Sequence, residues 1–227
     1  MNPLKSLEVG GRVPPQLQGL LRTIWPGTTW SVEGSDAVHL TFDDGPDPEV
    51  TLWVLDVLAQ HSAKATFFVV GDQAAKHPEV LDAVLRAGHA VGGHTMRHEK
   101  GWCTETVTYV KSALESIDGL MPLFRPPYGR LTPAQARHIG VHADLIMWDV
   151  LSGDFALDVH KAREVSSAQA RLQRRTKPGS VVVFHDSAKH AAGLKALLPD
   201  YLVWLSQSGV PMRALSPSPT RRLPEEA

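Results

Sequence analysis

The stretch TFDDGP at residues 41–46 determines how the rest of the chain can be interpreted. It closes an apolar run that starts at Val38, so two adjacent carboxylates, Asp43 and Asp44, follow a predicted buried strand. The carboxyl end of a strand is where α/β proteins place binding and catalytic groups. Two neighbouring acids can act differently there, one as a metal ligand and the other as a proton acceptor. A strand followed by an ordinary turn accounts for the same residues, because Asp and Gly are common in turns.

Composition places the chain among ordinary globular proteins. It has 227 residues, of which 43% are hydrophobic and 21% charged, with a net charge of -1. This length predicts one domain with a sizeable core. Basic residues form no run longer than the pairs at 174–175 and 221–222, which argues against a nucleic-acid partner. The single cysteine, Cys103, cannot form an internal disulfide and leaves the compartment open.

The first thirty residues show neither a long apolar signal segment nor a stretch of about 18 apolar residues that could span a membrane. We therefore expect no transmembrane segment. The lack of a visible export signal favours the cytoplasm or the inner face of the envelope, unless the sequence is a trimmed mature form. The oligomeric state stays open.

Strand and helix patterns alternate some six or seven times along the chain. The predicted strands span 38–42, 65–70, 89–93, 142–148, 180–184 and 211–215. The predicted helices span 16–24, 104–120, 158–176 and about 193–208, with three more that begin near Pro48, Pro78 and Pro133. This alternation predicts an α/β fold with a parallel sheet covered by helices, which closes as a barrel or stays open.

Polar residues stand at the ends of the predicted strands, where parallel strands would bring them to one edge. They are Asp43 and Asp44, HTMRH at 94–98, RPPYG at 125–129, WDVLSGDF at 148–155 and His185. His94 and His98 are four residues apart, so on a helical turn both rings would point to one side and could share a metal. The alternative is that both histidines lie on a solvent-exposed face of a helix and bind no metal. Thr95 stands where a zincin helix has Glu, so Asp43 or Asp44 would have to supply a general base.

In this order the five stretches resemble the motifs of the NodB-like polysaccharide deacetylases, carbohydrate esterase family 4, a bacterial family. The motifs spread over 38–186, and the resemblance covers most of 36–215. It implies a distorted (β/α) barrel of about seven mostly parallel strands. We expect 1–35 to be an N-terminal lead-in that packs on this barrel, 36–215 to be the deacetylase domain and 216–227 to be a disordered tail.

The resemblance also implies the site. A divalent metal, usually zinc with Co, Mn or Ni as alternatives, would be held by Asp44, His94 and His98. Asp43 would be the general base, and His185 would protonate the leaving amine.

Further roles follow from the same resemblance. The backbone N–H of Tyr128, after Pro127, would stabilise the oxyanion, and Arg125 would hold the polar site in place. A structural salt bridge is compatible with that role of Arg125. Trp148 could stack on a sugar, although core packing also explains an aromatic residue after a strand. We expect Trp30 to plug the barrel, and no role for His190.

The fourth motif departs from the family pattern. Many relatives have Asp where this chain has Leu151, and Trp where it has Phe155. An acid of this motif orients the catalytic histidine in them, so here Asp154 or Asp149 would have to do so, or neither does. Without an anionic partner His185 would have a lower pKa.

The implied activity is removal of N-acetyl groups from N-acetylglucosamine-containing glycans, of the chitin oligomer or peptidoglycan type, with release of acetate. The substrate partner would then be an N-acetylated glycan or oligosaccharide. A related amidase acting on a small N-acyl substrate and an inactive glycan-binding protein on the same fold are the alternatives.

Overall fold

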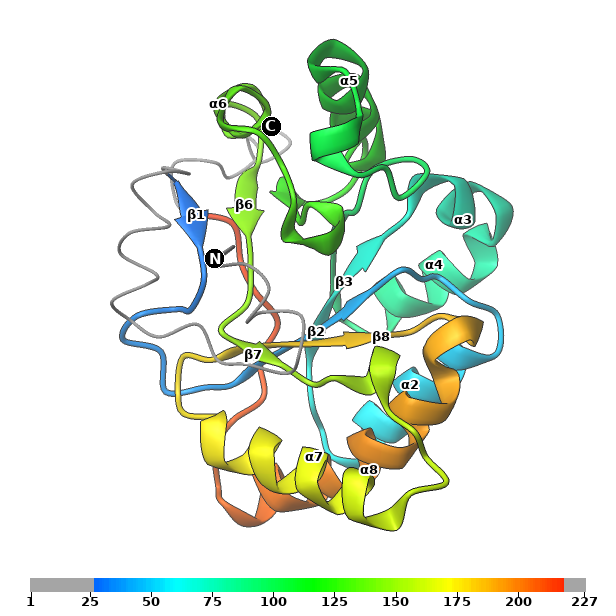
Figure 1. The fold of residues 1–227 in the computed structure, drawn as a ribbon, viewed down its shortest axis with the longest axis vertical. Coiled ribbons are helices and arrows are strands. Elements are labelled where there is room, and N and C mark those ends of the chain that lie inside the picture. Colours follow the sequence, from blue (N-terminus) through cyan, green and yellow to red (C-terminus); the bar gives the residue numbers. More distant parts are fainter. Residues whose placement is uncertain (1–26, 219–227) are drawn as a thin grey trace.

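The computed structural model describes residues 27–218, so the predicted helix at 16–24 lies outside the described residues (Figure 1). One curled parallel sheet runs through the molecule, with strand order β1-β6-β5-β4-β3-β2-β8-β7. The strands are β1 (Thr28–Thr29), β2 (His39–Asp43), β3 (Ala65–Val69), β4 (Ala90–Gly93), β5 (Leu123–Phe124), β6 (Asp144–Ile146), β7 (Val150–Leu151) and β8 (Val181–His185). The prediction of a distorted (β/α) barrel is confirmed, with eight strands instead of about seven.

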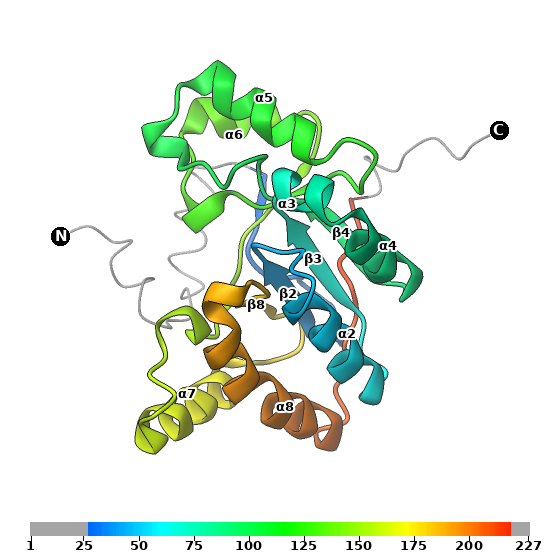
Figure 2. The same cartoon turned by 90° about the vertical axis from the view of Figure 1, so that its right-hand side faces the viewer.

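Helices surround the sheet on its outer side, as the two views in Figures 1 and 2 show. The helices are α2 (Val50–Gln60), α3 (Gly71–Lys76), α4 (Pro78–Arg86), α5 (Thr106–Ser116), α6 (Pro133–Ile139), α7 (Ala162–Arg175) and α8 (Ala191–Gln207). Short 3-10 turns lie at η2 (Gly101–Cys103), η3 (Pro127–Gly129), η4 (Asp154–Ala156) and η5 (Ala188–His190). None of the helices within 27–218 is long and apolar enough to cross a membrane.

Alternate side chains of β2 point either to the hydrophobic core or to the candidate site. Phe42 stacks on Phe67 and Phe184, with ring centroids 5.0 and 5.9 Å apart, within the cluster that packs against α2 and α8. Because successive side chains point to opposite faces, the neighbours Thr41 and Asp43 face the interior of the curled sheet. The strand β2 therefore delivers its terminal acid, Asp43, to the inside.

The segment 147–149 joins the two ends of the curled sheet. The backbone N–H of Met147 donates to the carbonyl of Thr29 beside β1, and that of Asp149 donates to Val181 of β8. The chain thus passes from β6, next to one edge strand, to β7 at the other edge. This crossing brings the fourth motif close to the ends of β2 and β8.

Local signals explain where two helices begin. Asp47 accepts hydrogen bonds at Oδ1 from the backbone N–H groups of Glu49 and Val50, the start of α2. Thr132 and Gln135 form a reciprocal capping box at the start of α6, with Pro133 in the first turn. Helices were predicted to begin near Pro48 and Pro133; α2 begins at Val50, with Glu49 at the N-cap position, and α6 begins at Pro133.

The C-terminal part differs from the prediction. The strand expected at 211–215 is reduced to an isolated bridge between Met212 and Val38. Ser218 donates to the carboxylate of Asp144, so the first residues of the segment 216–227 are held to the domain. The remainder, 219–227, lies outside the described residues.

Candidate active site

Arg125 and Asp43 form a buried ion pair at the centre of the barrel. Arg125 is fully buried, and its Nη1 donates to Oδ1 of Asp43 at 2.7 Å and to the hydroxyl of Thr41 at 2.6 Å. Its Nη2 donates to the carbonyl of Met147 at 3.0 Å, and the guanidinium lies 4.2 Å from the ring centroid of Phe68. A buried charge needs such partners to offset its lost hydration. Arg125 therefore fixes the position of Asp43.

Asp44, His94 and His98 come together beside this pair. Oδ1 of Asp44 lies 3.6 Å from Nε2 of His94 and 3.1 Å from Nε2 of His98, and all three donor atoms lie within 4.8 Å of one another. Oδ1 of Asp44 is buried and makes no hydrogen bond within the described residues. A buried carboxylate oxygen that faces two imidazole nitrogens without a hydrogen bond is an arrangement that could hold a divalent metal.

The tautomer of His94 also suits metal binding. Its Nδ1 donates to the carbonyl of Arg125 at 2.8 Å, which leaves the unprotonated Nε2 facing Asp44. Burial lowers the pKa of His94 to about 4, so the ring is neutral near pH 7. A neutral imidazole is the form that binds metals.

The backbone around these ligands is unusual. Asp44 and His98 have φ values of 79° and 58°, and Thr95 between the histidines has 63°. Positive φ is costly for residues other than glycine, and such strain gathers at functional sites. The prediction that His94 and His98 lie on a helical turn is wrong. They lie in a loop after β4, and the left-handed residues turn both rings toward Asp44.

His185, at the end of β8, is held by Asp154. Nδ1 of His185 donates to Oδ1 of Asp154 at 2.9 Å, and its backbone N–H donates to Oδ2 at 2.8 Å. Burial alone would lower the pKa of His185, but Asp154 and the more distant acids outweigh burial and raise that pKa to about 9. The ring is therefore protonated at neutral pH.

Tyr128 lies across the pocket from His185 in the turn η3. Its φ is 59°, its ring centroid is 4.7 Å from that of His98, and half of the residue is exposed. Within 27–218 no hydrogen bond engages its backbone N–H, whereas the N–H groups of Gly129 and Arg130 bond back to the preceding turn. One backbone donor at this loop is thus available to a ligand.

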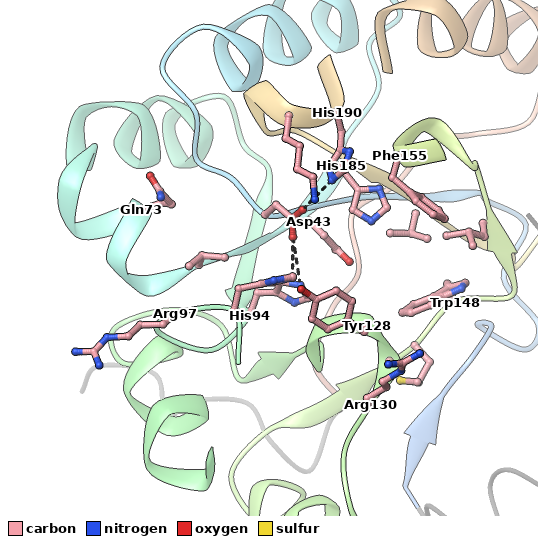
Figure 3. A pocket seen from close by; sticks show the side chains of 18 of the residues that line it. Asp43, Gln73, His94, Arg97, Tyr128, Arg130, Trp148, Phe155, His185 and His190 are labelled. Carbon is pink, nitrogen blue, oxygen red and sulfur yellow. Dashed lines mark ion pairs between the residues drawn. The ribbon is translucent and has the colours of Figure 1, made fainter. Parts of the chain in front are cut away.

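One pocket of about 900 Å³, shown in Figure 3, is lined by Asp43, Asp44, His94, His98, Tyr128 and His185. Gln73 and Arg97 lie on one side of it, and Trp148 and Phe155 lie on the other. The apolar residues that line it are Trp30, Val70, Met147, Trp148, Leu151, Phe155 and Val183. The pocket therefore has a polar centre with an apolar side.

Comparison with known proteins agrees with this geometry. A family model described as polysaccharide deacetylase matches residues 32–143. The chain is 31% identical over 194 residues to a peptidoglycan-N-acetylglucosamine deacetylase of Bacillus cereus, covering 80% of this chain and 87% of the relative. The chain belongs to the NodB-like polysaccharide deacetylase family. It is also 38% identical over 169 residues to a chitooligosaccharide deacetylase of Bradyrhizobium, covering 68% of this chain and 73% of the relative.

Solved structures of the NodB-like polysaccharide deacetylase family share the fold. A peptidoglycan N-acetylglucosamine deacetylase in complex with an N-hydroxybenzamide superposes with a TM-score of 0.75 at 26% identity, covering 83% of this chain and 91% of that chain. A family 4 carbohydrate esterase from Streptomyces lividans in complex with acetate gives a TM-score of 0.68 at 26% identity, covering 82% of this chain and 99% of that chain.

The altered fourth motif of this NodB-like deacetylase can now be described. Asp154 contacts His185, whereas Asp149 is fully buried and accepts hydrogen bonds from Ser180 and Val181 in the sheet. Of the two acids left open by the sequence, Asp154 is therefore the partner of His185. Leu151 lines the pocket instead of supplying a charge.

His190 and Trp30 are among the pocket residues that the sequence analysis did not assign to the site. His190 was expected to have no role, yet its Nε2 lies 3.9 Å from Oδ2 of Asp44 and its ring contacts that of His185 at 5.3 Å between centroids. Trp30 is 2% exposed, as expected of a plug, but it also lines the pocket. The sequence contained one hint of a role for His190, its position five residues after His185. Its contact with Asp44 could not be predicted, because it depends on how the turn η5 is folded.

Proposed function

We propose that this protein is a metal-dependent hydrolase that removes N-acetyl groups from N-acetylglucosamine-containing glycans and releases acetate. The observation that carries the proposal is the convergence of three groups on one pocket: the Arg125–Asp43 pair, the cluster of Asp44, His94 and His98, and the Asp154–His185 pair. The named functions of the relatives support the same substrate class.

The proposed metal ligands are Asp44, His94 and His98. One carboxylate oxygen and two imidazole nitrogens form a donor set suited to zinc, while Co, Mn and Ni accept the same atoms. Three protein ligands leave open positions, as in catalytic rather than structural zinc sites. A metal bound there would polarise the amide carbonyl and make a water molecule more acidic.

Asp43 is proposed as the general base. Arg125 occupies its Oδ1, so Oδ2 is the oxygen that takes a proton from the attacking water. Asp43 therefore needs no direct bond to a metal in order to act.

His185 is proposed as the general acid. Nδ1 is engaged by Asp154, so Nε2 carries the proton that is given to the leaving nitrogen when the C–N bond breaks. The pKa of about 9 keeps this proton in place at neutral pH. The free N–H of Tyr128 is the proposed donor to the oxyanion, and Pro127 fixes the turn that presents it.

The acetyl-group position follows from these roles. The scissile carbonyl would lie between the cluster formed by Asp44, His94 and His98 and the ring of His185. Trp148, on the apolar side of the pocket, is proposed to contact the sugar or its acyl group.

The test is a deacetylation screen over chitin oligomers, peptidoglycan fragments and small N-acetyl sugars. The protein is stripped with a chelator and then reloaded with Zn²⁺, Co²⁺, Mn²⁺ or Ni²⁺, and acetate and free amine are quantified. We expect acetate from at least one glycan, only after metal is returned. Binding of glycans without release of acetate from any of them would instead support a glycan-binding protein, and release from small N-acyl compounds alone would support an amidase.

A further inference from the structure

The loop 94–98 carries two of the proposed metal ligands, His94 and His98, on a short and irregular backbone. Thr95 and His98 have positive φ values of 63° and 58°. Within the described part of the chain, no backbone N–H of residues 95–99 donates to a backbone carbonyl. The loop therefore lacks the hydrogen bonds that hold a helix or a strand, and side chains have to provide acceptors for its N–H groups.

Ser112 of α5 and Glu99 provide two of these acceptors. The backbone N–H of Met96 donates to Oγ of Ser112 at 2.9 Å. The next N–H along the chain, that of Arg97, donates to Oε2 of Glu99 at 3.0 Å. The hydroxyl of Ser112 in turn donates to Oε1 of Glu99 at 2.8 Å, so the two acceptors are linked to each other. We call this pair the Ser112–Glu99 clamp.

A second helix, α3, holds the same loop through its carbonyl groups. The backbone N–H of Gly71 donates to the carbonyl of Thr95 at 2.9 Å, and that of Asp72 donates to the carbonyl of Met96 at 2.9 Å. The side chain of Thr95 is buried and accepts from the backbone N–H of Glu99 at 3.1 Å. The loop is therefore bonded to α3 through its carbonyls and to α5 through an N–H group.

The clamp acts on the ligands from outside the pocket. Neither Ser112 nor Glu99 lines the pocket, and Ser112 is only 6% exposed. An N–H that loses its acceptor in a partly buried place destabilises the conformation that leaves it unpaired. The positive φ values of Thr95 and His98 are costly for such residues and need support from their surroundings. Without the clamp, the loop is therefore free to take conformations that separate the two imidazole donors.

We propose that Ser112 and Glu99 are positioning residues of the metal site, which hold His94 and His98 in the metal-binding arrangement before a metal is bound. This inference rests on the proposed metal-dependent function. It concerns the affinity for the metal and the arrangement of its ligands. It gives neither Ser112 nor Glu99 a contact with the metal or with the substrate.

The experiment measures the Zn²⁺ affinity of the metal-stripped protein by competition with a chromogenic chelator. Ser112→Ala and Glu99→Ala each remove one part of the clamp, and the affinity should fall about 10- to 100-fold in each, as it does when residues that orient ligands are lost. The visible absorption spectrum of the Co²⁺-loaded protein should also change, because it depends on the ligand geometry. Urea denaturation of the metal-free proteins records folding stability separately.

Two further variants separate positioning from general damage. Glu99→Gln keeps an oxygen for the N–H of Arg97 and offers an amide N–H to the hydroxyl of Ser112, so it should recover most of the affinity that Glu99→Ala loses. Ser116→Ala is the matched control on α5. Ser116 is also buried, but its hydroxyl donates to the carbonyl of Ala113 within the same helix, so Zn²⁺ affinity should match the wild type.

The outcomes are distinguishable. Weaker Zn²⁺ binding in both alanine variants, with recovery in Glu99→Gln and none of this loss in Ser116→Ala, supports the inference. Wild-type affinity and an unchanged Co²⁺ spectrum in a folded alanine variant overturn it, even where urea denaturation shows lower stability, and leave the proposed function intact. Glu99→Ala, at a partly exposed residue, decides the question if Ser112→Ala does not fold. A wild type that binds no metal overturns the proposed function and the inference together.

Discussion

Asp154 holds His185 at two points, accepting hydrogen bonds from its Nδ1 at 2.9 Å and from its backbone N–H at 2.8 Å. The two contacts fix both the ring and the strand end that carries it. They also give His185 an anionic partner although Leu151 replaces the acid found in many relatives. The shift of the histidine pKa to about 9 depends on this carboxylate.

Removal of that charge should therefore move the pH profile. The folded-state pKa of His185 is raised above its ordinary value of 6.5, so the wild type should keep its general acid protonated up to about pH 9. In Asp154→Asn the pKa should fall toward or below 6.5, and the basic limb of kcat should shift to lower pH. We expect activity at pH 8 to fall by about 10-fold or more. An unchanged basic limb would assign Asp154 a structural role only.

The raised pKa of His185 also makes the stability of the protein depend on pH. A raised folded-state pKa stabilises the protein fully below pH 6.5, and this contribution is lost as pH rises through about 9. The wild type should thus lose more thermal stability between pH 7 and 10 than Asp154→Asn does. Equal losses in both proteins, measured by thermal denaturation, would contradict the pairing.

Two variants should distinguish the residues that bind the metal from the residue that acts as general base. Asp43→Asn should retain the metal and lose more than about 99% of kcat, since a general base typically contributes 10²–10⁴-fold. His98→Ala should lose the metal, because one of three donors is removed. Metal content by elemental analysis and acetate release are measured in the same preparations.

The control for these variants is His142→Ala, a change of an exposed histidine outside the pocket. It should match the wild type in both readouts. Near-normal turnover by Asp43→Asn would show that the general base is another group.

His190 should tune the metal site without holding the metal. Its Nε2 is 3.9 Å from Oδ2 of Asp44, on the side away from His94 and His98. His190→Ala should weaken metal affinity by about 10-fold, as the loss of a residue that orients a ligand typically does. Competition with a chromogenic chelator measures this affinity. Wild-type affinity in His190→Ala would mean that His190 does not position Asp44.

Gly193 allows α8 to lie directly against the loop that carries Asp154. A Cβ at residue 193 would collide with the backbone carbonyl of Asp154. Gly193→Ala should therefore destabilise the protein by about 1–3 kcal/mol and lower kcat by displacing Asp154.

Denaturant unfolding and kinetics of Gly193→Ala are compared with Asp200→Ala, an exposed change on the same helix, which should stay within about 0.5 kcal/mol of the wild type. Wild-type stability and rate in Gly193→Ala would show that the loop can move without cost.

The sequence predicted the long elements of the fold because their patterns are strong. Apolar residues dominate β3 and β8 and alternate with polar ones in β2, and Pro133 marks the start of α6. The strands β1, β5 and β7 have two residues each, too few for a period of two to appear. The pairing of these short strands depends on the curvature of the whole sheet, and a local sequence pattern carries no information about that curvature.

The site residues that lie at the ends of strands could be predicted from the sequence. The site residues whose positions depend on the conformation of a loop could not. Asp43, Asp44 and His185 follow apolar runs, and the sequence placed them at one edge. The loop around His94 and His98 was expected to be helical, because a spacing of four does not reveal positive φ at Thr95 and His98. Asp154 could not be separated from Asp149 until the crossing at 147–149 showed which acid faces His185.

The most direct test of the central claim is a titration of the metal-stripped protein with Zn²⁺, with acetate release from a chitin oligomer measured at each point. Activity should be absent without metal, rise in proportion to the Zn²⁺ added and level off at about one metal per chain, as expected of a single cluster of three ligands. Undiminished acetate release by protein that elemental analysis shows to be free of metal would contradict the account.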